Sequence, residues 1–174
     1  RLLEGQIPHL DFISIRPVGS ALLHLPIVAF GGEATYWISR LVVWVQFGCI
    51  AWIWNFLYQK VFETSLSITE SFFAGFVIFA FSVNNFPIMA WHSSDALFFA
   101  TIGFGICMGT DRKYKFLGYC ILGLAYLSRQ NFIFLIPIAL FILGDWKRIQ
   151  YWIAAAVPGL LYVAYLLTVH AFSD

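Results

Sequence analysis

The chain has 174 residues, of which 61% are hydrophobic and 11% are charged, and its mean hydropathy is +0.82. Soluble domains are about 45–50% apolar and about 25% charged. This composition therefore excludes an ordinary soluble domain and indicates an integral membrane protein. The formal net charge of +1 gives no electrostatic basis for binding nucleic acid.

The predicted elements are helical along the whole chain. Residues 1–16 form a polar lead-in, and Pro17–Phe30 is a short apolar segment closed by two glycines. As a helix this segment would be about 20 Å long, too short for a hydrocarbon core near 30 Å, so we expect it to lie at the interface. Six candidate spans follow: Ala34–Phe62, Ser71–Trp91, Ala96–Gly109, Phe116–Ser128, Phe132–Leu143 and Ile149–Val169. Pro158 is expected to kink the last span.

The predicted fold class is all-α integral membrane, a polytopic helical bundle of about six transmembrane helices plus one short juxtamembrane helix. We expect a single transmembrane domain over residues 1–174. Residues 1–33 would form an outer-face loop and the juxtamembrane helix, and residues 34–174 the spans. The chain is expected to be part of a longer protein.

The topology depends on Arg129. If residues 116–143 were one span, an arginine would lie at mid-bilayer, which costs about 2.5–3.5 kcal/mol. Two short helices that turn at Arg129 instead place the basic loops "DRKYK" (111–115) and "DWKR" (145–148) on one side, as the positive-inside rule requires. We expect this hairpin, with the lysines on the cytoplasmic side. The outer side would then carry Asp11, Arg16, Arg40, His92, Asp95 and Arg129.

Asp95, in "MAWHSSDALFF", is an acid between two apolar runs. One interpretation is helix capping, because Ser93, Ser94 or Asp95 stands just before an apolar run. The other is a carboxylate at the outer mouth of the bundle, able to act on a substrate or to position a metal. The two are compatible, since a capping residue can also face a cavity.

Two arginines of the outer side have alternative interpretations as well. Arg129 either extends to the lipid headgroups or binds a lipid-linked phosphate, for which the planar guanidinium is well suited. Arg40 either anchors its span at the interface or pairs with a phosphate or an outer carboxylate.

For other polar residues we have a single expectation each. Asp11 and Arg16 fall in the lead-in, where a solvated surface is expected. His24 is expected on the polar face of the interfacial helix. Gln46 and Asn55 lie inside a span and are expected to make interhelical hydrogen bonds.

Five stretches, in this order, resemble segments of the GT-C class of polytopic glycosyltransferases, which use polyprenyl-phosphate-linked sugars and include protein mannosyltransferases and aminoarabinose transferases. They are "GQIPHLDF", "RPVGSALLHLPIVAFGG", "ATYWISRLVVW", "WHSSDALFF" and "LGLAYLSRQNF". The chain departs from the family pattern at His9, where a tyrosine is usual, and at Val18, where a second proline or a glycine is usual.

The resemblance implies transfer of a sugar from a polyprenyl (dolichyl or undecaprenyl) phosphate to a lipid, glycan or protein acceptor. The reaction would take place at the periplasmic, extracellular or lumenal face of a bacterial cell membrane or the ER membrane. Asp95 would be a catalytic carboxylate, and its partner acid would lie upstream of Arg1. No cofactor is implied with certainty, and a divalent metal ion at Asp95 would need that second acid as co-ligand. The substrate and carrier phosphate would be bound by Arg129, Arg40, Arg16, Asp11, His92 and Gln130.

Two other functions are compatible with the composition. A transporter or flippase fragment would place polar groups at mid-depth and show repeat symmetry, and no repeat is evident. A non-catalytic membrane subunit of a larger assembly would use Asp95 as a helix cap alone.

Overall fold

The computed structural model describes residues 2–7, 18–85, 88–109 and 111–169. Within these ranges the regular structure is helical and contains no strand, which confirms the all-α prediction. Short 3-10 turns connect several of the helices, among them η4 (Gln130–Phe134). The α-helices are α1 Gly19–Phe30, α2 Thr35–Val61, α3 Ile68–Asn85, α4 His92–Gly109, α5 Lys115–Ser128, α6 Leu135–Ile142 and α7 Ile149–Thr168.

Three helical stretches in the described part of the chain are long and apolar enough to cross a membrane: Gly32–Val61, Ile68–Asn85 and Ile149–Thr168. The sequence predicts six such spans. The other three differ because α4 begins with a polar run, α5 has 14 residues and α6 has 8. At 1.5 Å per residue, α5 is only about 21 Å long.

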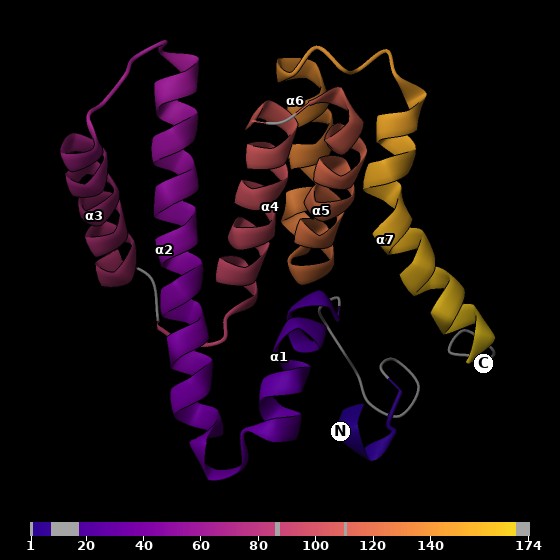
Figure 1. The fold of residues 1–174 in the computed structure, drawn as a ribbon. Helices are drawn as coiled ribbons and strands as arrows, with labels where there is room; N and C mark the ends of the chain where they lie inside the picture. Colours follow the sequence, from indigo (N-terminus) through magenta and orange to yellow (C-terminus); the bar gives the residue numbers. More distant parts are fainter. Residues whose placement is uncertain (1, 8–17, 86–87, 110, 170–174) are drawn as a thin grey trace.

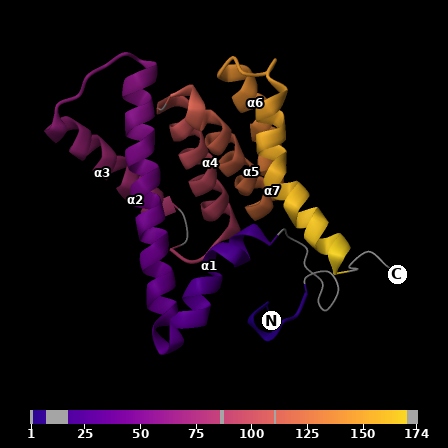
Figure 2. The same cartoon turned by 45° about the vertical axis from the view of Figure 1, so that its right-hand side comes forward.

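Successive helices from α2 to α7 alternate in direction, so the bundle has two ends (Figures 1 and 2). The first, called here the α1 end, contains α1, the starts of α2 and α4 and the end of α5. The second, called here the basic end, contains the loops "DRKYK" and "DWKR". Both ends of the described chain lie near the α1 end (Figure 1).

The chain reverses direction at Arg129. Helix α5 ends at Ser128, Arg129 adopts an extended conformation (φ −149°, ψ 119°), and η4 leads into α6. As a result, Lys115 at the start of α5 lies beside Asp145 just after α6, with Nζ 2.6 Å from Oδ2. The predicted hairpin is therefore confirmed, and both basic loops lie at the same end.

Small residues bring the central helices together. A Cβ added to Gly103 of α4 would lie 2.8 Å from the carbonyl oxygen of Gly118 in α5. A Cβ on Gly123 of α5 would lie 3.0 Å from ring atoms of Pro158 in α7. Small residues at such contacts are typical of helix pairs in membranes, where close backbone packing replaces the hydrophobic effect.

Helix α1 confirms the predicted short apolar helix. It ends at Gly31, whose N–H donates to Ile27 O at 2.8 Å, and Gly32 then adopts the left-handed φ of +50° that turns the chain into α2. At its other end, Gly19 is so close to α5 that an added Cβ would meet the carbonyl carbon of Leu127 at 2.7 Å. Helix α1 therefore packs against the bundle.

The peripheral helices α3 and α7 bear on two further predictions. Helix α3 begins and ends earlier than the predicted Ser71–Trp91, and Gly75 is its one buried residue. Four of its five phenylalanines, Phe72, Phe73, Phe76 and Phe81, are exposed, as expected for a lipid-facing surface. Helix α7 contains Pro158 and changes direction partway along (Figures 1 and 2), in agreement with the predicted kink.

Candidate functional site

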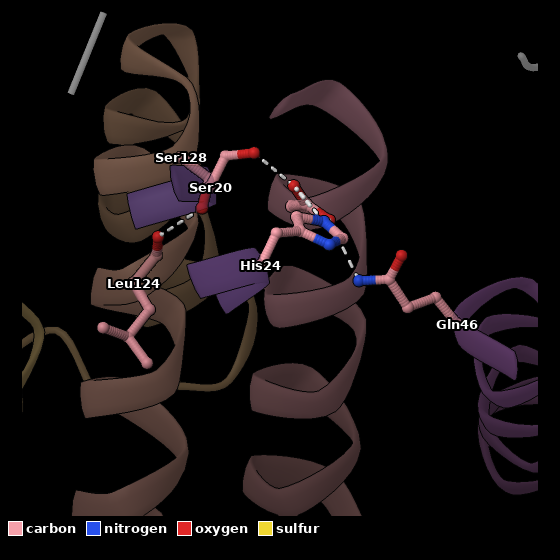
Figure 3. Close-up of polar contacts among 6 residues, drawn as sticks. Ser20, His24, Gln46, Leu124 and Ser128 are labelled. Atoms are coloured by element: carbon pink, nitrogen blue, oxygen red, sulfur yellow. Dashed lines mark hydrogen bonds and ion pairs between the residues drawn. The ribbon is translucent and has the colours of Figure 1, made fainter. Parts of the chain in front are cut away.

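Asp95 lies in the first turn of α4 and is completely buried. Its carboxylate accepts hydrogen bonds from side chains of two other helices, and Figure 3 labels the donors Ser20, His24 and Gln46. Ser20 Oγ, from α1, donates to Oδ2. His24 Nε2, also from α1, lies 3.1 Å from Oδ1 and 3.2 Å from Oδ2, and Gln46 Nε2 of α2 donates to Oδ1 at 2.9 Å.

His24 lies on the polar face of α1, as predicted, and this face is turned into the bundle. The residue is 7% exposed and contacts Asp95. An ionised carboxylate only accepts hydrogen bonds, so with Asp95 ionised this contact requires the tautomer of His24 that carries its proton on Nε2. Ser20 and His24 are four residues apart, which places them on the same face of α1. That spacing, in an otherwise apolar helix, is the sequence signal that could have located the contact.

The predictions for two polar residues inside α2 are confirmed. Gln46 makes its interhelical hydrogen bond to Asp95 of α4. Asn55 Nδ2 donates to both the carbonyl oxygen and Oγ of Ser71 in α3, at 3.0 Å each. Each amide therefore joins α2 to a neighbouring helix, as expected for polar groups surrounded by apolar side chains.

The contacts of Asp95 show a structural role. In the described structure its hydrogen-bond donors come from α1 and α2, so the carboxylate joins three helices. Burying a charged carboxylate is unfavourable unless it is hydrogen-bonded, and three donors fulfil that condition. The position near the start of α4 is favourable too, because the helix dipole is positive there.

Three buried polar atoms around Asp95 have no hydrogen-bond partner among the described residues: His24 Nδ1, Gln46 Oε1 and Ser94 Oγ. The cluster therefore has the capacity for further polar contacts. A metal centre is not evident, since no group of three or more histidine, cysteine or acidic residues occurs in the described part of the chain.

Arg129 lies at the same end of the bundle as Asp95. It follows the last residue of α5, is exposed, and its Nη1 donates to Ser93 Oγ at the start of α4. Ser93 Oγ also accepts a hydrogen bond from Trp91 Nε1 at 2.9 Å. The guanidinium of Arg129 is therefore bound to Ser93, which precedes Asp95 by two positions in the chain. Because it has five N–H donors, this contact leaves it able to bind an anion.

The remaining predicted site residues are more scattered. Arg40 of α2 is half-buried with its guanidinium carbon 4.6 Å from the ring centre of Tyr36, and no described hydrogen bond or ion pair joins it to Asp95 or Arg129. His92 is half-buried and stacks on Trp91, with ring centres 5.1 Å apart.

Three further predicted site residues complete the set. Gln130 is exposed in η4, next to Arg129. Asp11 and Arg16 lie outside the described residues. Arg129 thus contacts one end of the short polar run Ser93–Asp95, and Asp95 forms its other end. No described contact joins Arg40 to either residue.

A groove of about 540 Å³ runs along α5 between α1 and α7, and sequence reasoning missed it. Its walls are almost entirely apolar. Along α5 it extends from Leu117 to Leu127, two residues before Arg129. The lining residues are Val18, Leu22, Leu117, Cys120, Ile121, Leu124, Leu127, Pro158, Leu161, Tyr162 and Tyr165.

A second polar cluster, at the basic end, was also missed. Asp145 is 2% exposed, and Lys115 and Arg148 pair with its carboxylate at 2.6 and 3.4 Å. Tyr119 Oη donates to Asp145 Oδ2 at 3.2 Å, and the Tyr119 ring stacks on Tyr151 with ring centres 4.9 Å apart. The sequence indicated only a basic loop here, whereas the structure shows a buried carboxylate that joins α5, α6 and α7.

Comparison of the chain with models of protein families, with curated proteins and with solved structures found no match.

Proposed function

We propose that the protein is a membrane glycosyltransferase that moves a sugar from a polyprenyl phosphate to a lipid, glycan or protein acceptor at the α1 end. The observation that carries the proposal is the position of Arg129, which is exposed, donates to Ser93, and follows by two residues Leu127, the last α5 residue that lines the apolar groove. This pairing of a guanidinium with a long apolar channel suits a ligand with a phosphate head and a hydrocarbon tail.

The proposed orientation places the α1 end at the outer or lumenal face, with α2 to α7 as six spans. The cations of the basic end support it, because cytoplasmic loops are enriched in lysine and arginine. The length of α5 supports it as well. At about 21 Å it is shorter than a hydrocarbon core near 30 Å, so Arg129 would lie near the depth of lipid phosphates.

The chemistry requires stabilisation of charge on the departing phosphate. When the bond between the sugar C1 and the phosphate oxygen breaks, that oxygen keeps the electron pair, and the acceptor hydroxyl forms the new bond to C1 and loses its proton. Arg129 would stabilise the developing negative charge. A base near the acceptor would take the proton.

Asp95 receives a different role from the one that the resemblance implies. Its carboxylate is buried and bonded to Ser20, His24 and Gln46, so it does not reach an acceptor in this arrangement. We assign it as a positioning residue that fixes α1, one wall of the groove. In Asp95→Asn the KM for the carrier should then rise while kcat is retained. Loss of kcat at unchanged KM would instead support a catalytic carboxylate.

Carrier binding tests the proposal directly. The purified chain in detergent is titrated with a polyprenyl phosphate and with the matching polyprenol, and retained lipid is counted by native mass spectrometry. We expect preference for the phosphate, lost in Arg129→Ala and kept in the control Lys60→Ala, an exposed lysine in the last turn of α2. Equal binding of both lipids by the unaltered chain would overturn the assignment of the phosphate site.

The groove provides a second pair of variants. Leu161 lines it, whereas the neighbouring Leu160 does not and is 62% exposed. Leu161→Trp should reduce retention of both lipids, and Leu160→Trp should leave it unchanged.

Sugar transfer from a polyprenyl phosphate pentose or hexose is then assayed with the unaltered chain and Arg129→Ala. Carrier binding without transfer would favour a carrier-binding subunit or flippase.

A further inference from the structure

The basic end gathers charge from two loops that are distant in sequence. Residues 111–115 and 145–148 contribute five cations and two carboxylates, a net charge of +3. The ion pair between Lys115 and Asp145 holds the loops together, and Arg148 adds a second contact to the same carboxylate. Asp145 is therefore buried and paired within the protein, and its charge does not neutralise the exposed cations of these loops.

Three cations of these loops do not pair with Asp145 in the structure. Arg112, Lys113 and Lys147 are exposed. The other acidic residue of these two loops, Asp111, has a side chain that is 80% exposed, and its Oδ2 lies 3.8 Å from Lys113 Nζ. Ion pairs between exposed groups contribute little. This surface, defined by Arg112, Lys113 and Lys147 and called here the cation surface, thus keeps its positive charge.

Aromatic rings place the cation surface at a bilayer boundary. Tyr114 and Trp146 are 46% and 48% exposed. Lys113 Nζ lies 4.8 Å from the ring centre of Tyr114, and Lys147 Nζ lies 5.0 Å from that of Trp146. Exposed tyrosine and tryptophan are enriched at headgroup level, where an apolar ring and a polar edge are both accommodated. The two lysines would consequently lie among the headgroups.

The helix starts at this end add to the positive potential. Both α5 and α7 begin here, and neither has an acidic residue in its first turn or a hydrogen bond from a capping side chain. The usual preference is the opposite one, since acidic side chains stabilise the positive end of the helix dipole. An anion supplied from outside the chain would provide that compensation.

We propose that the cation surface binds the phosphate groups of anionic phospholipids in the leaflet that it faces. The exposed rings favour a lipid headgroup over a soluble anion, because they fix the lysines at the boundary between water and hydrocarbon. This inference depends on insertion in a membrane and not on the proposed sugar transfer. Each cation near an anionic surface strengthens binding about fivefold.

The test compares phosphatidylglycerol with phosphatidylcholine of identical acyl chains. The full chain in zwitterionic detergent is titrated with each lipid, and both the melting temperature and the number of retained lipids are measured. We expect phosphatidylglycerol to raise the melting temperature and to be retained preferentially. In Arg112→Gln/Lys113→Gln/Lys147→Gln its affinity should fall on the order of 100-fold. The melting temperature without added lipid should be unchanged, since these side chains are exposed.

A charge-conserving variant is the matched control. Lys113→Arg/Lys147→Arg should keep the preference for phosphatidylglycerol. Glycerol phosphate, added at the same concentrations, should produce no stabilisation. Equal effects of the two lipids, or stabilisation by glycerol phosphate as strong as that by phosphatidylglycerol, would overturn the proposal. Because no sugar transfer is measured, the result leaves the proposed transferase activity to its own assay.

Discussion

His24 of α1 and Asp95 of α4 meet inside the bundle although 71 residues separate them, with Nε2 3.1 Å from Oδ1. Through this contact, a helix too short to cross a bilayer becomes part of the core at the α1 end. Ser20 and Gln46 bond to the same carboxylate, so one acid joins α1, α2 and α4. The stability of this end should therefore depend on Asp95 and its donors.

Asp95→Ala should destabilise the protein more than His24→Ala. Removal of the carboxylate leaves two buried donors, His24 and Gln46, and the partly buried Ser20 without an acceptor, and each buried donor left unsatisfied costs about 1–3 kcal/mol. Removal of His24 leaves two donors on Asp95 and should cost about 1–3 kcal/mol. Thermal unfolding in detergent measures both. Equal and small losses of stability in the two variants would contradict the arrangement described at Asp95.

Gly103→Leu should separate α4 from α5. The added side chain would overlap Leu122 Cγ and the Gly118 carbonyl, and overpacking of this kind typically costs about 1–3 kcal/mol. Gly48 of α2 is the matched control, because a Cβ there meets nothing within 4 Å. Gly48→Ala should be neutral or stabilise the helix by up to about 1 kcal/mol. A loss in the control as large as that in Gly103→Leu would refute the steric explanation.

Asp145→Ala should loosen the basic end. The substitution removes the acceptor of Lys115 and Tyr119 from a site that is 2% exposed, with an expected loss of about 3–5 kcal/mol. Asp111→Ala removes an exposed carboxylate from the neighbouring loop and should change stability by less than about 0.5 kcal/mol. Comparison of the two melting temperatures separates the buried ion pair from a general effect of charge.

Single cysteines should react from opposite sides of the membrane at the two ends of the bundle. In a background with Cys49, Cys107 and Cys120 replaced by serine, Gln130→Cys should be labelled from outside and Lys113→Cys from inside by a reagent that does not cross the bilayer. Both positions are exposed in the structure. Labelling of both from one side would contradict the proposed orientation.

Much of the fold was predictable from local patterns. Apolar runs bounded by glycine, proline or charge gave the helices, and the energetic penalty of Arg129 at mid-bilayer gave the reversal between α5 and α6. Gln46 and Asn55 were correctly expected to bond across helices, because polar groups inside an apolar run have few other partners. These inferences need only the chain near each residue.

The candidate site was less predictable, because it depends on packing between distant segments. The partner of His24 was not predicted, since the sequence does not show that α1 lies against α4, and the burial of Asp145 in its loop was not predicted either. The groove along α5 depends on the placement of α1 and α7. Arg40 and Arg129 share a predicted side, yet the described contacts place them in different surroundings.

The contact between α1 and α4 also constrains the order of biosynthesis. Ser20 and His24 are made well before Asp95, and at about 5–20 residues per second the interval is roughly 4 to 14 s. During that time α2 and α3 are produced, and Asp95 is not yet present to accept from Ser20 and His24. The contact that joins α1 to α4 can therefore form only after two intervening helices have been made.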